Sequence, residues 1–192
     1  MNKAPEKLTP MVEQYHRMKQ HDPDCLLFYR LGDFYELFFE DAIIASKLLG
    51  LVLTQRQDMP MCGIPWHTYE MYLSKLVNHG YRVAICEQTE TPEEAKKRGN
   101  KGPVDRRIVR IVTSGTLVED ALLVSKSNNY LLSIIRDKDI IGFAYADVSS
   151  GRFLLEQSSI RDLISIITKI NPAEIICLDS LCNDKNILDE LD

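Results

Sequence analysis

Residues 26–39 read LLFYRLGDFYELFF and hold six aromatic side chains. Two short apolar runs, Cys25 to Arg30 and Phe34 to Phe39, flank the turn sequence Leu31-Gly32-Asp33. Apolar runs of this length separated by Gly and Asp are typical of buried strands joined by a tight turn. We therefore predict a β-hairpin here, with a substantial part of the core on its strands.

Core packing explains Phe34 less well than the other aromatic residues of this hairpin. Phe34 directly follows the Gly-Asp turn, where an aromatic side chain is poorly placed to be fully buried. Side chains alternate along a strand, so Glu36 shares a face with Phe34. An exposed aromatic ring near positive charge can stack on a nucleic-acid base. The residues themselves leave two interpretations open for Phe34, base stacking and packing in the core.

The remaining elements up to residue 117 alternate between helices and strands. Capping residues and apolar spacing predict helices, and short β-prone runs predict strands. The predicted helices are 10–20, 41–49, 68–79 and a short one from Thr91, and the predicted strands are 51–55, 81–87 and 106–112, with a loop over 56–67.

The polar run Ser125 to Asn129 marks a change of character, and we place a linker at 118–127. Beyond it, the pattern predicts strands 130–136, 140–148 and 152–157, a helix 160–170 and a strand 174–178. Three meander strands, a helix and a further strand resemble the opening of a ribonuclease-H-like α/β domain, of which the chain would hold only the start.

Charge is distributed unevenly along the chain, whose net charge is -5. Residues 1–117 carry 16 Lys and Arg against 15 Asp and Glu, whereas 118–192 carry 7 against 13. A positive cluster surrounds the single acid Asp105 and comprises Lys96, Lys97, Arg98, Lys101, Arg106, Arg107 and Arg110. Such a cluster suits phosphate, and its alternative is an ordinary solvated surface.

The common enzyme signatures are absent from the sequence. It has no phosphate loop of the Gly-x-x-x-x-Gly-Lys-Ser/Thr type, no Gly-x-Gly-x-x-Gly, no His-Glu-x-x-His and no Gly-x-Ser-x-Gly. The five cysteines are scattered and never spaced as Cys-x-x-Cys, so we expect reduced thiols and no zinc site. No apolar run is long enough to predict a membrane span.

Several ordered blocks resemble one family. Gly32-Asp33-Phe34-Tyr35-Glu36 resembles the Phe-x-Glu signature of the MutS family of DNA mismatch-repair proteins. Further blocks in matching order are 45–49, 53–56, 60–67, 83–88, 101–104, 107–113, 147–153 and 171–174. Blocks spread over nearly the whole chain are far more specific than any single motif.

The resemblance implies a fold and a division of the chain. It implies an α/β (α+β) fold, in which a mixed β-sheet flanked by helices is followed by the start of a ribonuclease-H-like connector domain. Residues 1–117 would be the mismatch-recognition domain, 118–127 a linker and 128–192 a partial connector domain. The chain would thus be an N-terminal fragment without the ATPase part, and not itself an enzyme.

The resemblance also implies site residues and partners. Phe34 would insert into the minor groove at a mispaired or unpaired base, and Glu36 would accept a hydrogen bond from that base. Arg56, Met61 and Arg110 would make supporting contacts. We expect no cofactor in this fragment, but ATP and Mg²⁺, a homodimer, MutL-type partners and a cytoplasmic, nucleoid-associated location for the full-length protein. The alternative is a non-catalytic interaction module of the same fold that does not read mismatches.

Overall fold

The computed structural model describes residues 9–99, 102–118 and 128–183. Contacts divide the chain into two compact units, Met1–Val112 and Thr113–Asp192. The boundary after Leu117 stays a prediction, and nearly all of the predicted linker lies outside the described residues. The two units are described separately below.

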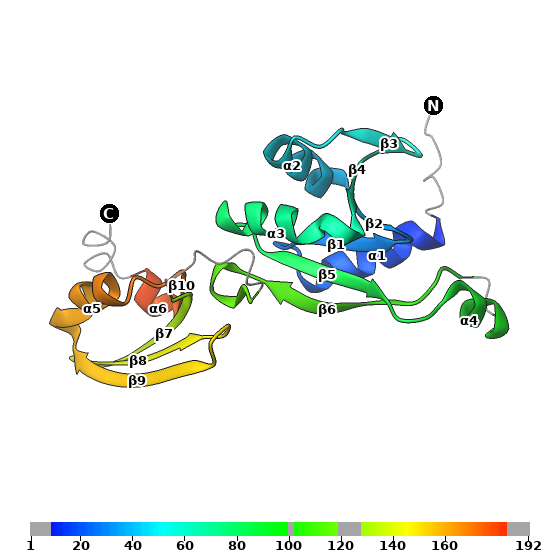
Figure 1. The fold of residues 1–192 in the computed structure, drawn as a ribbon. Helices are drawn as coiled ribbons and strands as arrows, with labels where there is room; N and C mark the ends of the chain where they lie inside the picture. The colour runs from blue at the N-terminus through cyan, green and yellow to red at the C-terminus, as the bar shows by residue number, and fades with distance from the viewer. Residues whose placement is uncertain (1–8, 100–101, 119–127, 184–192) are drawn as a thin grey trace, which may run out of the picture. The chain divides into compact units, whose positions relative to one another are not determined.

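The first unit contains a six-stranded mixed sheet flanked by helices, as Figure 1 shows. Its elements are α1 (Pro10–His21), β1 (Leu26–Leu31), β2 (Phe34–Phe38), α2 (Phe39–Leu49), β3 (Thr54–Arg56), β4 (Met59–Pro65), η1 (Trp66–Thr68), α3 (Tyr69–Asn78), β5 (Val83–Gln88), α4 (Pro92–Lys97) and β6 (Arg106–Val112). The strand order is β3-β4-β2-β1-β5-β6, in which only β1 and β5 run parallel. The predicted hairpin is confirmed, and it lies at the centre of this sheet.

Alternation along β1 and β2 divides the core into two layers. On one face, Tyr29 and Phe38 pack edge-to-face against Tyr15 of α1. On the other face, Tyr35 contacts Tyr69 of α3, and Cys62 donates its thiol hydrogen to the carbonyl of Ala42 in α2. The central hairpin is therefore buried from both sides over most of its length, which explains its aromatic and apolar composition.

Strand β4 differs from the sequence-based expectation. We predicted a loop over these residues, and Pro60, Gly63 and Pro65 are each unfavourable inside a strand. The structure instead pairs β4 with β2 on one side and with the short strand β3 on the other. Gln57 and Asp58 connect β3 to β4 in a two-residue turn with positive φ at both positions, as a type I′ hairpin turn requires.

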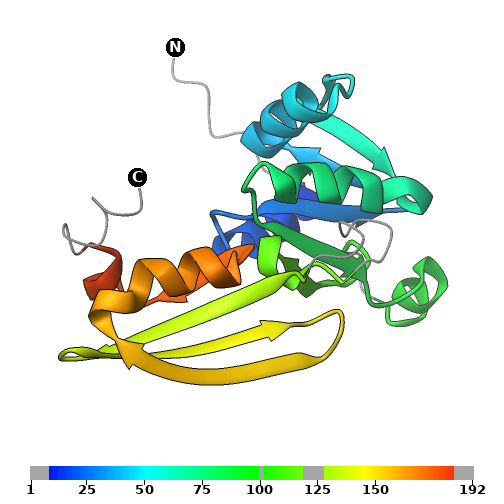
Figure 2. The same ribbon diagram turned by 60° about the vertical axis from the view of Figure 1, so that its left-hand side comes forward.

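The second unit is a four-stranded sheet in the order β10-β7-β8-β9. Its elements are η2 (Ser114–Thr116), β7 (Tyr130–Asp137), β8 (Ile140–Asp147), β9 (Arg152–Ser159), η3 (Ile160–Asp162), α5 (Leu163–Ile170), β10 (Glu174–Cys177) and α6 (Asp179–Cys182). The predicted order of three strands, a helix and a fourth strand is confirmed. Leu132, Ile141 and Phe143 form the core of this unit with Leu163 of α5. Figure 2 shows α5 over one face of the sheet.

Cysteine and membrane expectations have mixed outcomes. Cys25, Cys62 and Cys86 are buried free thiols, and burial raises the pKa of Cys62 to about 11 and that of Cys86 to about 12. Cys177 is disulfide-bonded, so the expectation of reduced thiols throughout was wrong. Within the described residues, no helix is long and apolar enough to cross a membrane.

Candidate nucleic-acid interface

Phe34 is the first residue of β2. It lies on the sheet face against which α1 packs, at an end of that face that α1 does not cover. Phe34, Glu36 and Phe38 share this face because side chains alternate along a strand. Phe38 is buried beneath Tyr15, whereas 46% of the Phe34 surface is exposed. One face of a single strand thus carries both a core ring and an exposed ring.

The turn before β2 and the strand beside it set the position of Phe34. Leu31 pairs with Phe34 across a two-residue turn in which Gly32 has a φ of +61°, a conformation that favours glycine. On its other side, Phe34 pairs with Pro65, next along this face from Gly63. A methyl group at Gly63 would lie 3.5 Å from Cδ1 of Phe34. The Phe34 ring therefore lies close to Gly63, and a side chain at position 63 would contact it.

Glu36 lies two residues further along the same face and is paired with Arg56. The Nη1 of Arg56 donates to Oε2 of Glu36 at 2.6 Å. The Glu36 side chain is 14% exposed and the Arg56 side chain 39% exposed. Figure 1 shows β4 curving away from β2 toward β3, and this hairpin supplies Arg56.

Met61 also belongs to this face. It pairs with Phe38 on β2 and with Thr54 on β3, and its half-buried side chain packs against the aromatic cluster beneath α1. The structure therefore gathers four of the predicted site residues, Phe34, Glu36, Arg56 and Met61, on one face of the β2–β4–β3 part of the sheet.

Arg110 lies apart from these four residues. It is on edge strand β6, which is the third strand from β2, a separation of about 14 Å at about 4.8 Å per strand. It pairs with Ile85, whose neighbour Phe28 contacts Tyr35 on the α3 side of the sheet. Register therefore directs Arg110 to the face opposite Phe34.

The positive cluster is smaller than its sequence suggests. Arg106 is buried, where its guanidinium lies over the Tyr29 ring and donates to Gln14 and to the backbone carbonyl of Arg30. Arg98 is paired with Glu90 at 2.5 Å and with Asp105 at 3.1 Å. A bulge in β6 shifts the register at Ile85 and Cys86, so exposed arginines and buried aliphatic residues do not alternate regularly along the strand. Of the described members, Lys96, Lys97, Arg98 and Arg107 are exposed, and Arg98 is the one that makes the two ion pairs above.

Sequence reasoning missed a second aromatic group at the same end of the sheet. Trp66 follows β4 directly, is 48% exposed, and donates its backbone N–H to the carbonyl of Asp33 in the turn before Phe34. The Arg30 guanidinium lies 4.6 Å from the Trp66 ring centroid. The sequence Pro65-Trp66-His67 gave no indication that Trp66 would lie beside the turn at Asp33. That contact forms only because the preceding residues make strand β4.

The phenols beneath the site are held in their neutral form. Burial, followed by the hydrogen bond to Glu87, raises the pKa of Tyr35 well above its ordinary value. Burial also raises the pKa of Tyr29 to about 12, although the nearby Arg106 acts in the opposite direction. Neither phenol therefore adds a negative charge near the β2–β4–β3 part of the sheet.

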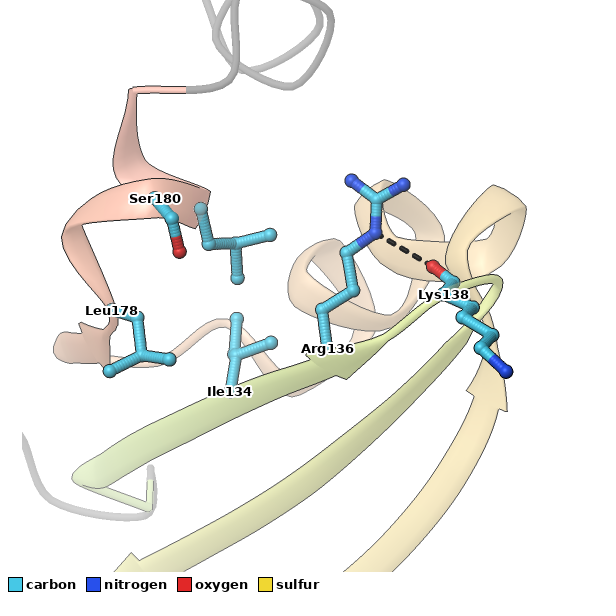
Figure 3. Close-up of a pocket in the computed structure, with 6 residues that line it drawn as sticks. Ile134, Arg136, Lys138, Leu178 and Ser180 are labelled. Carbon is cyan, nitrogen blue, oxygen red and sulfur yellow. Dashed lines mark hydrogen bonds between the residues drawn. The ribbon is translucent and has the colours of Figure 1, made fainter.

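The second unit has a pocket of about 240 Å³ with a different character, drawn in Figure 3. It lies between β7 and α6, is walled by Ile134, Leu178 and Leu181, and includes Arg136, whose Nε donates to the carbonyl of Lys138 at 2.8 Å. None of the predicted site residues lines it. Among the described residues, no group of three His, Cys, Asp or Glu side chains could hold a metal ion.

Comparisons with known proteins agree over almost the whole chain. The family model described as MutS domain I matches residues 9–139, and the model described as MutS domain II matches residues 129–192. A protein of Bradyrhizobium sp. (strain ORS 278) named DNA mismatch repair protein MutS is 50% identical over 95% of this chain and 21% of its own length. Proteins of the same name from Bartonella henselae and Wolbachia pipientis wMel are 51% and 49% identical over 94% and 97% of the chain. The chain spans about a fifth of the length of these relatives.

Proposed function

The chain belongs to the MutS family of DNA mismatch repair proteins, and from that premise we propose that its first unit recognises mispaired or unpaired bases in duplex DNA. The observation that carries the proposal is the half-exposed ring of Phe34, which shares a sheet face with Glu36. The hairpin that carries this ring is buried on both faces over most of its length. An exposed aromatic ring held in this way is suited to contact with an apolar partner surface, such as the face of a base.

Phe34 acts as a wedge in this mechanism. Inserting an apolar side chain between base steps costs a few kcal/mol of unstacking and kinks the duplex. The cost is lower where a mispair has already weakened stacking and pairing. The wedge therefore discriminates by local deformability and not by sequence, so that the same residue serves many kinds of mispair.

Glu36 supplies the polar part of the contact. A carboxylate near the phosphate backbone is repelled, so its presence beside the wedge is best explained by a hydrogen bond accepted from a base. Met61, at the other end of the same face, is assigned a supporting contact. The exposed Lys96, Lys97 and Arg107 add sequence-independent affinity, with roughly one unit of log–log salt slope for each phosphate contact.

Competition binding of mismatched and perfectly paired duplexes tests the proposal. We would compare wild type with Phe34→Ala at low salt, using the longest natural chain that contains these residues beside the 192-residue chain. Base stacking on an aromatic side chain is worth about 1–3 kcal/mol, which is roughly a 5- to 150-fold change in affinity. Phe34→Ala should therefore bring the affinities for the two duplexes to near equality.

The matched control is Phe153→Ala, which removes another exposed phenylalanine, from β9 in the second unit. It should leave mismatch preference unchanged. A long chain that binds both duplexes equally, or a Phe34→Ala variant that keeps full preference, would contradict mismatch reading and favour the interaction module.

Changes at Glu36 should have a smaller and partly opposite effect. Glu36→Ala removes the repelled carboxylate and leaves Arg56 without its partner at the DNA-facing surface. We expect reduced preference for the mismatch together with higher affinity for the matched duplex. Separate titrations of the two duplexes measure these effects, and unchanged affinities for both would contradict the role given to Glu36.

The whole protein's other properties are proposals from family membership. They are binding of ATP with Mg²⁺, a homodimer, interaction with downstream MutL-type partners, and a cytoplasmic, nucleoid-associated location. This chain corresponds to MutS domains I and II, and its sequence contains no phosphate loop. We therefore assign it recognition and no catalytic step, and Arg110 a supporting contact distinct from the wedge face.

A further inference from the structure

The ion pair between Glu36 and Arg56 joins the central strand to the edge hairpin of the sheet. The two residues are 20 positions apart, and the contact of 2.6 Å forms across β4. Glu36 pairs with Gly63 on β4, whereas Arg56 pairs with Met59 further along the same strand. The Arg56 side chain therefore reaches the carboxylate diagonally across β4.

The pair leaves the two carboxylate oxygens in different surroundings. Oε2 accepts from Arg56, and among the described residues no other side chain is recorded as donating to Glu36. The Glu36 side chain is only 14% exposed, so its position in the sheet restricts its solvation. A largely buried carboxylate is stabilised by a charged donor. Arg56 thereby orients the carboxylate so that Oε1 is the oxygen available to a further donor.

The pair also changes the charge that the wedge face presents to DNA. Glu36 alone would place a negative charge beside the ring that must approach the phosphate backbone, and that charge would weaken binding to every duplex. With Arg56 at 2.6 Å, the two groups together are neutral. Arg56 can thus act on mismatch reading without itself touching the DNA.

We propose that Arg56 is the positioning residue of Glu36, which presents one carboxylate oxygen to the mispaired base and neutralises the charge of the carboxylate. The inference rests on the proposed function of Phe34 and Glu36. It differs from a phosphate contact by Arg56 in one respect. A phosphate contact adds equally to the binding of matched and mismatched duplexes, whereas a positioning residue changes their ratio, and only while the carboxylate is present.

The test is a cycle of variants in the longest natural chain that contains these residues. Dissociation constants for a mismatched and a matched duplex are measured for wild type, Arg56→Met, Glu36→Gln and the double variant. We expect Arg56→Met to reduce the ratio of the two constants by about three- to tenfold, the range of a partly exposed ion pair and its hydrogen bond. In the Glu36→Gln background, the same change should leave the ratio within error of its starting value.

Two further variants serve as controls for the ratio of the two dissociation constants. Lys47→Met removes one exposed positive charge from α2, on the other side of the sheet, and should leave the ratio unchanged. Arg56→Lys keeps a positive charge but lacks the planar donor fork, and should retain more of the ratio than Arg56→Met. Because the lysine variant keeps the charge that Glu36 needs, it also covers the case in which Arg56→Met fails to fold.

Each result has a distinct meaning. A ratio that Arg56→Met leaves unchanged, or lowers equally with and without the carboxylate, overturns the inference and makes Arg56 a phosphate contact or a structural residue. If Arg56→Lys reduces the ratio of the two dissociation constants as much as Arg56→Met does, the positive charge of Arg56 is not what supports Glu36, and that part of the inference is overturned. The wild-type measurement distinguishes failure of this inference from failure of the proposed function. Equal binding of both duplexes by wild type would overturn mismatch recognition itself, and the role of Arg56 with it.

Discussion

Phe34, Phe28 and Phe38 lie within one hairpin, yet they have different environments. Phe28 and Phe38 are fully buried in opposite layers, whereas Phe34 stands at the end of β2 with half of its surface exposed. The sequence left Phe34 between core packing and base stacking. Its exposure favours the second interpretation, because a core residue with this much exposed surface would contribute little to folding.

Stability measurements on two alanine variants separate these roles. Phe28→Ala should lower the free energy of unfolding by about 3–5 kcal/mol, as truncation of a buried aromatic residue does. Phe34→Ala should lower it by no more than about 1 kcal/mol, since much of its surface is already in water. Urea titrations of the 192-residue chain give both values. Equal losses would identify Phe34 as a core residue.

Gly63 offers a second test at the level of one residue. Its backbone is not in the left-handed region, and a methyl group there would meet the Phe34 ring at an ordinary contact distance of 3.5 Å. Gly63→Ala should therefore keep mismatch preference and stabilise the strand by about 0.5–1 kcal/mol. Gly63→Val should be at least as stable but bind mismatches several-fold more weakly, because its second methyl group restricts the ring. Thermal melts and duplex titrations measure both, and a valine variant with full preference would show that the ring does not use this space.

At the level of elements, the hairpin β3–β4 supplies Arg56 and Met61 to the face that carries Phe34 and Glu36, and only part of this hairpin was predicted. Strand 51–55 was expected, whereas the structure begins β3 at Thr54 and adds β4, whose prolines and glycine argued against a strand. Pairing with β2 overrides these local preferences because β4 fills the space beside a central strand. Local sequence preference could not show this, since the stabilising contacts are with residues more than 20 positions away.

A pH-dependent element lies in the second unit, at the turn that follows β8. The buried Asp147 accepts hydrogen bonds from the hydroxyl and backbone N–H of Ser149 and from the backbone N–H groups of Ser150 and Asn129. These bonds, that of the Ser149 hydroxyl first, hold the pKa of Asp147 below its usual value. A depressed carboxyl pKa adds stability above the unfolded value of about 4, and that stability is lost as the pH falls through the folded value.

Asp147→Asn should therefore destabilise the second unit at neutral pH and flatten its loss of stability in acid. The expected cost at pH 7 is about 1–3 kcal/mol, the value of bonds to a buried charged acceptor. Far-UV circular dichroism of chemical unfolding between pH 7 and pH 2 measures the effect. An Asp147→Asn variant with the same acid dependence as wild type would assign that dependence to other carboxylates.

For the whole molecule, the main result is that each unit has its own core. Leu37 is fully buried in the first unit, and Leu132 is fully buried in the second. The chain has a single tryptophan, Trp66, which belongs to the first unit, so its fluorescence reports on that unit alone.

Truncating one core should shift one unfolding transition only. Leu37→Ala should cost the first unit about 2–5 kcal/mol and lower the midpoint of the Trp66 fluorescence transition. Leu132→Ala should leave that midpoint unchanged and lower the stability seen by circular dichroism. A fluorescence midpoint that moves equally in both variants would mean that the two units unfold as one cooperative system.

Most of the elements, the central hairpin and the family were readable from the sequence, because turns, caps and period-two alternation are local and ordered motif blocks are specific. Strand β4 was not. Phe34 and Glu36 could be named as candidate site residues from the motif blocks. The tertiary structure decided which charges the site has: it paired Glu36 with Arg56, buried Arg106 over Tyr29, and directed Arg110 to the opposite face of the sheet. Ion pairs, burial and facing depend on strand register and on partners distant in the chain, and local sequence patterns do not carry that information.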